Sequence, residues 1–133
     1  FCNLTTNVHH MQRLTCADLM LDTFPVCSHT TASDALWAGL PLVTLSGRSM
    51  VSRVAGSILK EAGLEELITS SLKEYKFKIL NLANNPSYLR KIKQKVSLLK
   101  ECKTLFNTEK KTKGIEEQYK ILFNNFKKED SNV

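Results

Sequence analysis

The sequence predicts an α/β fold in which a parallel sheet is followed by a run of C-terminal helices. In the first half of the chain, short apolar stretches typical of buried strands alternate with helical segments, which is the pattern of parallel α/β sheets. In the second half, apolar residues recur every three or four positions, as they do on amphipathic helices. We therefore expect an α/β part over residues 1–63, a helical part over residues 64–127 and a frayed polar tail over residues 128–133.

The α/β part is expected to alternate helices and strands. In chain order, its elements are a helix over 8–16, a strand over 18–22, a helix over 30–38, a strand over 42–45 and a helix over 51–62. Gly39 and Pro41 are expected to end the second helix, because glycine suits the left-handed conformation after a helix and proline cannot continue one. Gly63 can end the third helix in the same way.

The helical part carries three apolar stripes. Pro86 suits the first position of a helix, so it separates the first stripe from the second. Stripes with this spacing are expected to pack in a core rather than to contact a cofactor. They consist of Leu72, Tyr75, Ile79 and Leu82; Leu89, Ile92, Val96 and Leu99; and Ile115, Tyr119, Leu122 and Phe126.

The start of the second helix has the features of an anion-binding site. It follows a strand, and open α/β sheets bind their ligands at the carboxyl ends of strands. Thr30 and Thr31 can cap the helix, whose free N–H groups and dipole favour a phosphate. Asp34 lies one turn further on, within reach of a sugar hydroxyl. Taken alone, the same pattern also fits a capped helix that binds nothing.

Longer stretches of the chain resemble a known family. These stretches are residues 21–25, 29–31, 34–39, 40–45, 52–55 and 105–108. Together they closely resemble the C-terminal catalytic lobe of the O-GlcNAc transferase and SPINDLY family, and the resemblance covers most of the chain. It implies a GT-B glycosyltransferase with two Rossmann-like lobes, of which this chain is part of the second. On this interpretation the chain is a fragment without the first lobe and the tetratricopeptide repeats that usually precede it.

The resemblance also implies a nucleotide-sugar site at the start of the second helix. Thr30 and Thr31 match the family positions that bind the phosphates, and His29 matches a position beside the diphosphate. Asp34 matches the ribose ligand.

His10 and Arg13 match the positions where the family places a nucleobase-stacking histidine and a base-contacting arginine. One helical turn separates them, so they can face the same side. An imidazole can stack on uracil, and a guanidinium can donate to a carbonyl of the base. Asn7 departs from the basic residue that the family usually has nearby.

The implied reaction is transfer of GlcNAc from UDP-GlcNAc, with inversion, to Ser or Thr hydroxyls of intracellular proteins. The sequence has no Asp-x-Asp motif of the kind that holds a metal in many such enzymes, so we expect no metal and no other cofactor. Fixed positive potential from helix N–H groups and cationic side chains would take the place of the metal. No residue of this chain is assigned as the general base, and Arg48 and Arg53 stay outside the expected site.

Charge and cysteine content favour an intracellular protein that binds no specific nucleic acid. The net positive charge is concentrated in residues 70–133, which contain fifteen Lys/Arg and seven Asp/Glu. These charges alternate with apolar positions, as on solvated helix faces, and no RNA-binding aromatic signature accompanies them. Four cysteines without CxxC pairs, and without a secretion signal, are expected to be free buried thiols rather than zinc ligands or disulfides. No apolar run is long enough to span a membrane.

Three alternatives stay open. The SPINDLY branch transfers fucose from GDP-fucose, although it tends to lack the counterparts of His29 and Asp34. A non-catalytic nucleotide-binding or helical interaction module is a second alternative, and a polyanion-binding protein is a third. The sequence before Phe1 would best separate them.

Overall fold

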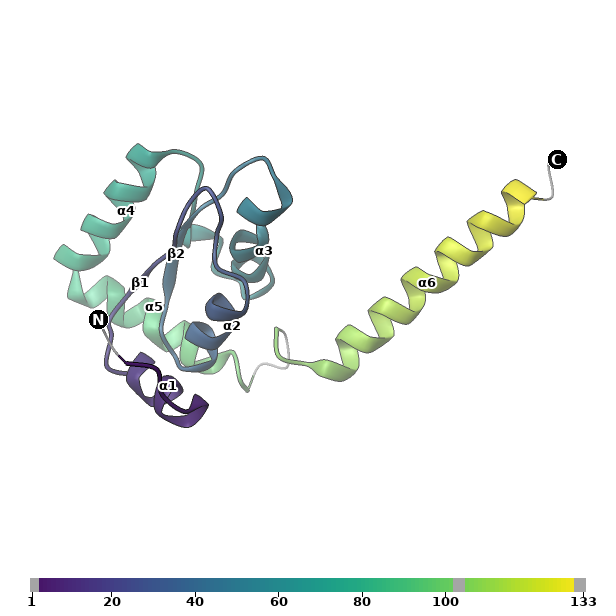
Figure 1. The fold of residues 1–133 in the computed structure, drawn as a ribbon. Coiled ribbons are helices and arrows are strands. Elements are labelled where there is room, and N and C mark those ends of the chain that lie inside the picture. Colours follow the sequence, from purple (N-terminus) through teal and green to yellow (C-terminus); the bar gives the residue numbers. More distant parts are fainter. Residues whose placement is uncertain (1–2, 102–104, 131–133) are drawn as a thin grey trace.

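Three parallel strands form the centre of the computed structural model, which describes residues 3–101 and 105–130 (Figure 1). They are β1 (Met20–Leu21), β2 (Leu42–Leu45) and β3 (Ile68–Thr69), in the order β1-β2-β3. Met20 pairs with Leu42 at one side of β2, and Thr44 pairs with Ile68 at the other. The parallel sheet predicted from the sequence is therefore confirmed.

Helices cover both faces of this sheet (Figure 1). The two crossover helices, α2 (Thr30–Trp37) and α3 (Val54–Glu61), lie on one face, and α4 (Leu72–Asn84) packs on the other against β2 and β3. Next, α5 (Pro86–Leu98) contacts both α4 and α2, and the N-terminal α1 (Asn7–Leu14) contacts α2. Short 3₁₀ turns at Met50–Ser52 and Glu65–Leu67 precede α3 and β3.

The core lies between the sheet and its helices. Burial of apolar side chains contributes most of the favourable free energy of folding, about 1.5–3 kcal/mol for each large aliphatic side chain. The fully buried large side chains include Leu36, Leu42, Val43, Leu59, Leu64, Leu67, Leu82, Ile92 and Val96. The first two predicted stripes thus supply Leu82, Ile92 and Val96 to the core, whereas Leu72 remains 45% exposed.

Two glycines end helices as predicted. Gly39 has φ of +85° and follows α2, and Gly63 has φ of +68° and follows α3. Both occupy the left-handed region that other residues adopt only at a cost, so the chain can turn sharply into β2 and toward β3.

The expected division at residue 63 is wrong in one respect, because β3 lies beyond it. A strand of only two residues leaves no period that sequence reading can detect. Its stability comes from pairing with β2 and from the Thr69 hydroxyl, which donates a 2.8 Å hydrogen bond to the Thr44 carbonyl. The residues before α3 also form a 3₁₀ turn rather than the start of the helix predicted over 51–62.

The third predicted stripe does not reach the core. It lies on α6 (Thr108–Asp130), a helix that projects from the rest of the molecule (Figure 1). Ile115, Tyr119, Leu122 and Phe126 are all more than half exposed, so periodicity correctly predicted the helix but not a neighbour for it. The helix also continues to Asp130, so the tail expected to fray is in part helical; residues 131–133 lie outside the described residues.

The cysteine prediction holds for one of the two described cysteines. Cys27 is a buried free thiol, whereas Cys16 is free but exposed. Cys2 and Cys102 lie outside the described residues. Every helix in the part of the chain that the structure describes is too short or too polar to cross a membrane.

Candidate functional site

The start of α2 presents free backbone donors at the carboxyl end of β1. His29 is the residue before the helix, and its carbonyl accepts hydrogen bonds from Ala32 N and Ser33 N at 3.1 and 3.3 Å. Thr30 and Thr31 occupy the first two helical positions, and within the described residues no acceptor pairs with their N–H groups. These N–H groups and the positive end of the helix dipole can bind an anion.

The predicted capping role of the two threonines is wrong. A capping side chain must come from the residue before the helix, which is His29, and no side-chain cap is formed there. Both threonines lie inside the helix and are exposed, so their hydroxyls as well as their N–H groups face solvent at the helix start. Because no side chain caps the helix, more of its backbone N–H groups remain free for a ligand than the predicted cap would leave.

One backbone carbonyl fixes the segment that carries His29. The Val51 carbonyl accepts from Cys27 N at 3.0 Å and from the Cys27 thiol at 3.0 Å. The His29 ring nitrogen Nε2 lies 3.4 Å from the same oxygen. Because a carbonyl only accepts, this contact places the proton on Nε2, and Nδ1 donates to a ligand only when the ring is protonated.

The loop between β1 and α2 is organised by Asp22, which is 3% exposed. Its Oδ1 accepts from Thr23 N at 2.9 Å and from Ser28 N at 2.7 Å, and its Oδ2 accepts from the Thr44 hydroxyl at 2.6 Å. The Asp22 backbone carbonyl accepts from the hydroxyl of Tyr75 at 2.7 Å. Strand β1, strand β2 and helix α4 therefore meet at this residue.

His10 and Arg13 form a direct pair on α1. An Arg13 guanidinium nitrogen lies 2.8 Å from His10 Nδ1, and because arginine only donates, Nδ1 is the acceptor. In the neutral tautomer that fits this contact, the ring proton is on Nε2. Both side chains are half-buried, whereas His9 is exposed, as expected. The packing of α1 against α2 places the pair on a helix next to the one that carries Asp34.

Asp34 lies one turn into α2 and is half-buried. Within residues 3–101 and 105–130, its carboxylate makes no hydrogen bond or ion pair. A half-buried carboxylate without a partner is available to accept hydrogen bonds from ligand hydroxyls. The positions of the six predicted residues are thus compatible with one ligand that lies along α2, with its phosphates at the helix start and its sugar hydroxyls at Asp34.

A cavity of about 350 Å³ opens at the same edge of the sheet. Residues that follow all three strands line it, among them Phe24, Ser46, Arg48 and Ser70. None of the six predicted residues lines this cavity, whereas Arg48, which is outside the predicted site, does. Its lining combines several serine hydroxyls with apolar side chains, a combination that suits a polar organic group.

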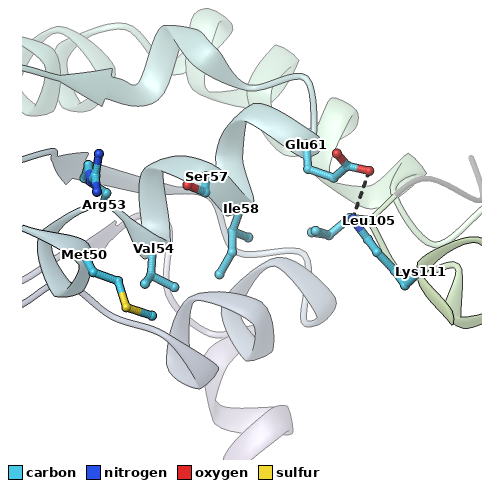
Figure 2. Close-up of a pocket in the computed structure, with 8 residues that line it drawn as sticks. All are labelled: Met50, Arg53, Val54, Ser57, Ile58, Glu61, Leu105 and Lys111. Atoms are coloured by element: carbon cyan, nitrogen blue, oxygen red, sulfur yellow. Dashed lines mark ion pairs between the residues drawn. The ribbon is translucent and has the colours of Figure 1, made fainter. Parts of the chain in front are cut away.

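A second cavity, of about 470 Å³, lies along the outer face of α3 (Figure 2). Figure 2 shows Arg53 at one end of it and the 3.1 Å ion pair between Glu61 and Lys111 at the other. None of the six predicted residues lines this cavity. It is separate from the candidate site, and Arg53 belongs with it.

The described residues include no metal centre. Across residues 3–101 and 105–130, no three His, Cys, Asp or Glu side chains gather closely enough to hold a metal ion. At the start of α2, the free donors are the backbone N–H groups of Thr30 and Thr31. The sequence prediction missed Asp22 as a residue of this site; its signal was an acidic residue directly after an apolar strand and before a turn.

Comparisons with known proteins identify the family of the chain. The family model described as glycosyl transferase family 41 matches residues 1–115. A probable UDP-N-acetylglucosamine–peptide N-acetylglucosaminyltransferase of Arabidopsis thaliana is 36% identical over 126 residues, which are 93% of this chain and 13% of that protein. The corresponding transferase of Caenorhabditis elegans is 37% identical over 108 residues, 80% of this chain and 9% of that protein.

A solved structure has the same fold. The K341M mutant of the Thermobaculum terrenum O-GlcNAc transferase superposes with a TM-score of 0.86 at 27% identity, over 91% of this chain and 23% of that chain. The fold is therefore that of part of a GT-B catalytic lobe. The chain spans about an eighth or less of the length of the curated relatives it matches.

Proposed function

The chain belongs to glycosyl transferase family 41, and we propose that it is the nucleotide-binding part of a protein O-GlcNAc transferase. The enzyme transfers GlcNAc from UDP-GlcNAc to Ser or Thr hydroxyls of proteins, with inversion and without a metal. The names of its relatives support the donor and the peptide acceptor, since they read UDP-N-acetylglucosamine–peptide N-acetylglucosaminyltransferase.

One observation carries the proposal most directly. Two unpaired N–H groups at the start of α2 and the unpaired Asp34 carboxylate lie one helical turn apart. A nucleoside diphosphate needs donors for its phosphates and acceptors for its ribose hydroxyls, in that order along its length. The His10–Arg13 pair on the adjacent helix supplies a ring face and a donor for the base.

Each group has a defined part in the reaction. As the bond between the sugar and UDP breaks, negative charge grows on the diphosphate, and the donors of Thr30 and Thr31 stabilise it. His29 lies directly before these donors, and its Nε2 contacts the Val51 carbonyl, which orients the ring beside the same phosphates. Asp34 and His10 hold the nucleoside so that the anomeric carbon is correctly placed for in-line attack.

The acceptor hydroxyl belongs to the protein substrate, and the general base and a further cation come from the part of the enzyme outside this chain. We propose that the exposed apolar face of α6 packs against that part of the enzyme. The face includes Ile115, Tyr119, Leu122 and Phe126, each more than half exposed here. We also keep an intracellular location for the enzyme as a prediction.

Sugar transfer tests the proposal. Full-length enzyme is incubated in EDTA with an acceptor peptide and either radiolabelled UDP-GlcNAc or radiolabelled GDP-fucose. We expect label from UDP-GlcNAc only, and none when the 133 residues are used alone. Label from GDP-fucose would favour the O-fucosyltransferase alternative, and UDP binding without any transfer would favour a binding module.

A further inference from the structure

The Asp22 side chain accepts more hydrogen bonds than any other side chain in the described part of the molecule. It has no part in the proposed reaction. It stands at the end of β1 and is buried without a cationic partner: among the described residues, no ion pair includes it. A buried carboxylate needs hydrogen bonds to offset its loss of hydration. Here neutral donors supply all of them.

The arrangement of those donors is specific. Oδ1 accepts from Thr23 N and from Ser28 N, so one oxygen holds the first residue of the loop and a residue five positions later. The loop is thereby closed on itself directly before His29. Oδ2 faces the sheet and bonds the hydroxyl of the buried Thr44. One oxygen therefore shapes the loop, and the other anchors the carboxylate to the sheet.

The loop is held from two further sides. The Phe24 ring meets the Tyr75 ring edge to face, with centroids 5.8 Å apart, and the Tyr75 hydroxyl bonds the Asp22 carbonyl. At the far end, Cys27 bonds the Val51 carbonyl and accepts from Ala55 N at 3.3 Å. The segment that leads into α2 is thus fixed before any ligand arrives.

From this geometry we infer that Asp22 is a positioning residue for the nucleotide-sugar substrate. Its carboxylate sets the loop conformation that places His29 and the N–H groups of Thr30 and Thr31 at the diphosphate. The inference rests on the proposed function, because it takes a nucleoside diphosphate as the ligand. Preorganised hydrogen-bond donors stabilise developing charge without rearranging during the reaction. Loosening the loop therefore weakens binding of the nucleotide sugar first.

Three variants of the full-length enzyme test this, with UDP as the probe. Asp22→Ala removes both acceptors, and we expect the Kd for UDP to rise at least about tenfold, the effect of losing hydrogen bonds to a charged group. Asp22→Asn keeps an amide oxygen that can accept from Thr23 N and Ser28 N, and its NH₂ can donate to Thr44. We expect it to recover most of the lost affinity. The KM for UDP-GlcNAc should follow the Kd, while the KM for the acceptor peptide stays unchanged.

Thr69→Val is the matched control. It removes a buried 2.8 Å hydrogen bond to a backbone carbonyl of the same sheet without touching the loop. We expect it to lower the Tm and to leave the Kd for UDP unchanged. A loss of affinity that follows the loss of Tm equally in D22A and T69V would overturn the inference, as would D22N binding as weakly as D22A.

Amide hydrogen exchange of the unmodified enzyme covers the case in which D22A does not fold. The Ser28 amide should exchange slowly without UDP and change little when UDP is added. Fast exchange that slows only on UDP binding would show that the loop is not preset and would contradict the inference. If the unmodified enzyme binds no UDP, the proposed function fails; if it binds UDP and D22A binds equally well, only the role of Asp22 fails.

Discussion

The hydroxyl of Tyr75 donates a 2.7 Å hydrogen bond to the backbone carbonyl of Asp22, 53 residues away along the chain. It joins α4 to the end of β1 beneath the candidate site. Burial raises the pKa of Tyr75, and the nearby charge of Asp22 raises it further, so the hydroxyl keeps its proton throughout the neutral range. Helix α4 therefore supports the ligand-binding edge from the opposite face of the sheet.

Tyr75→Phe should destabilise the protein by about 1 kcal/mol, because the buried Asp22 carbonyl loses its hydrogen-bond partner while the ring contact remains. Chemical denaturation of the 133-residue chain measures this. Tyr88→Phe is the control, since Tyr88 is half-buried on α5 and its hydroxyl makes no described hydrogen bond. Equal stability of Y75F and the unmodified chain would show that the bond contributes nothing.

Asp34→Ala in the full-length enzyme should weaken UDP binding by about 1–3 kcal/mol, the range for a charge-assisted hydrogen bond to the ribose. Ser33→Ala, at the neighbouring half-buried position of α2, should leave the affinity unchanged. Isothermal titration gives both values. A UDP affinity in D34A as high as in S33A would remove Asp34 from the site.

His10→Ala should reduce discrimination among nucleobases, because the ring that would hold the base against Arg13 is lost; stacking on such a ring contributes about 1–3 kcal/mol. The ratio of UDP to GDP affinity is expected to fall in this variant. His9→Ala is the matched control, as an exposed histidine on the same helix. The assignment of the base site to α1 would be wrong if the ratio fell equally in both variants.

The ion pair between Lys95 and Glu66, 2.6 Å long, should stabilise the chain only above acidic pH. Burial alone would raise the pKa of Glu66, but the hydrogen bond and charge of Lys95, together with a backbone hydrogen bond and the charge of Lys78, hold that pKa below its usual value. A carboxyl with a lowered folded-state pKa stabilises the fold above its unfolded pKa and loses that effect as the pH falls through the folded value.

Lys95→Ala should therefore cost about 0.2–1 kcal/mol at neutral pH, as expected for a partly exposed pair, and nothing once Glu66 is protonated. Denaturation curves at neutral and acidic pH test this, with the exposed Lys91→Ala on the same helix as control. A cost for K95A that stays constant with pH would mean that Lys95 acts through packing rather than charge.

Sequence reading predicted those parts of the fold that depend on local pattern. Strand β2 was predicted with its exact bounds, and Gly39 and Gly63 end their helices as expected. Strand β3 was missed, because two residues carry no period and pair only through β2. The α6 stripe was predicted as core, because periodicity shows that a face is apolar and not what covers it.

In the candidate site, too, the features that depend on local pattern could be predicted and those that depend on distant residues could not. The His10–Arg13 contact follows from one-turn spacing, and the structure contains it. The role of Asp22 depends on partners at Ser28, Thr44 and Tyr75, which only the folded chain brings together. The predicted cap at Thr30 and Thr31 was wrong because the helix begins at Thr30, so that His29 is the capping residue. Helix ends are where sequence patterns are least exact.

The central claim is that this chain carries a metal-free site for a nucleoside diphosphate. The most direct measurement is isothermal titration of UDP into the full-length enzyme in EDTA, repeated with the D34A variant. We expect the unmodified enzyme to bind UDP with one site per chain, the variant to bind more weakly, and added Mg²⁺ or Mn²⁺ to change neither affinity. Binding that appears only after a divalent metal is added, or no binding at all, would contradict the account.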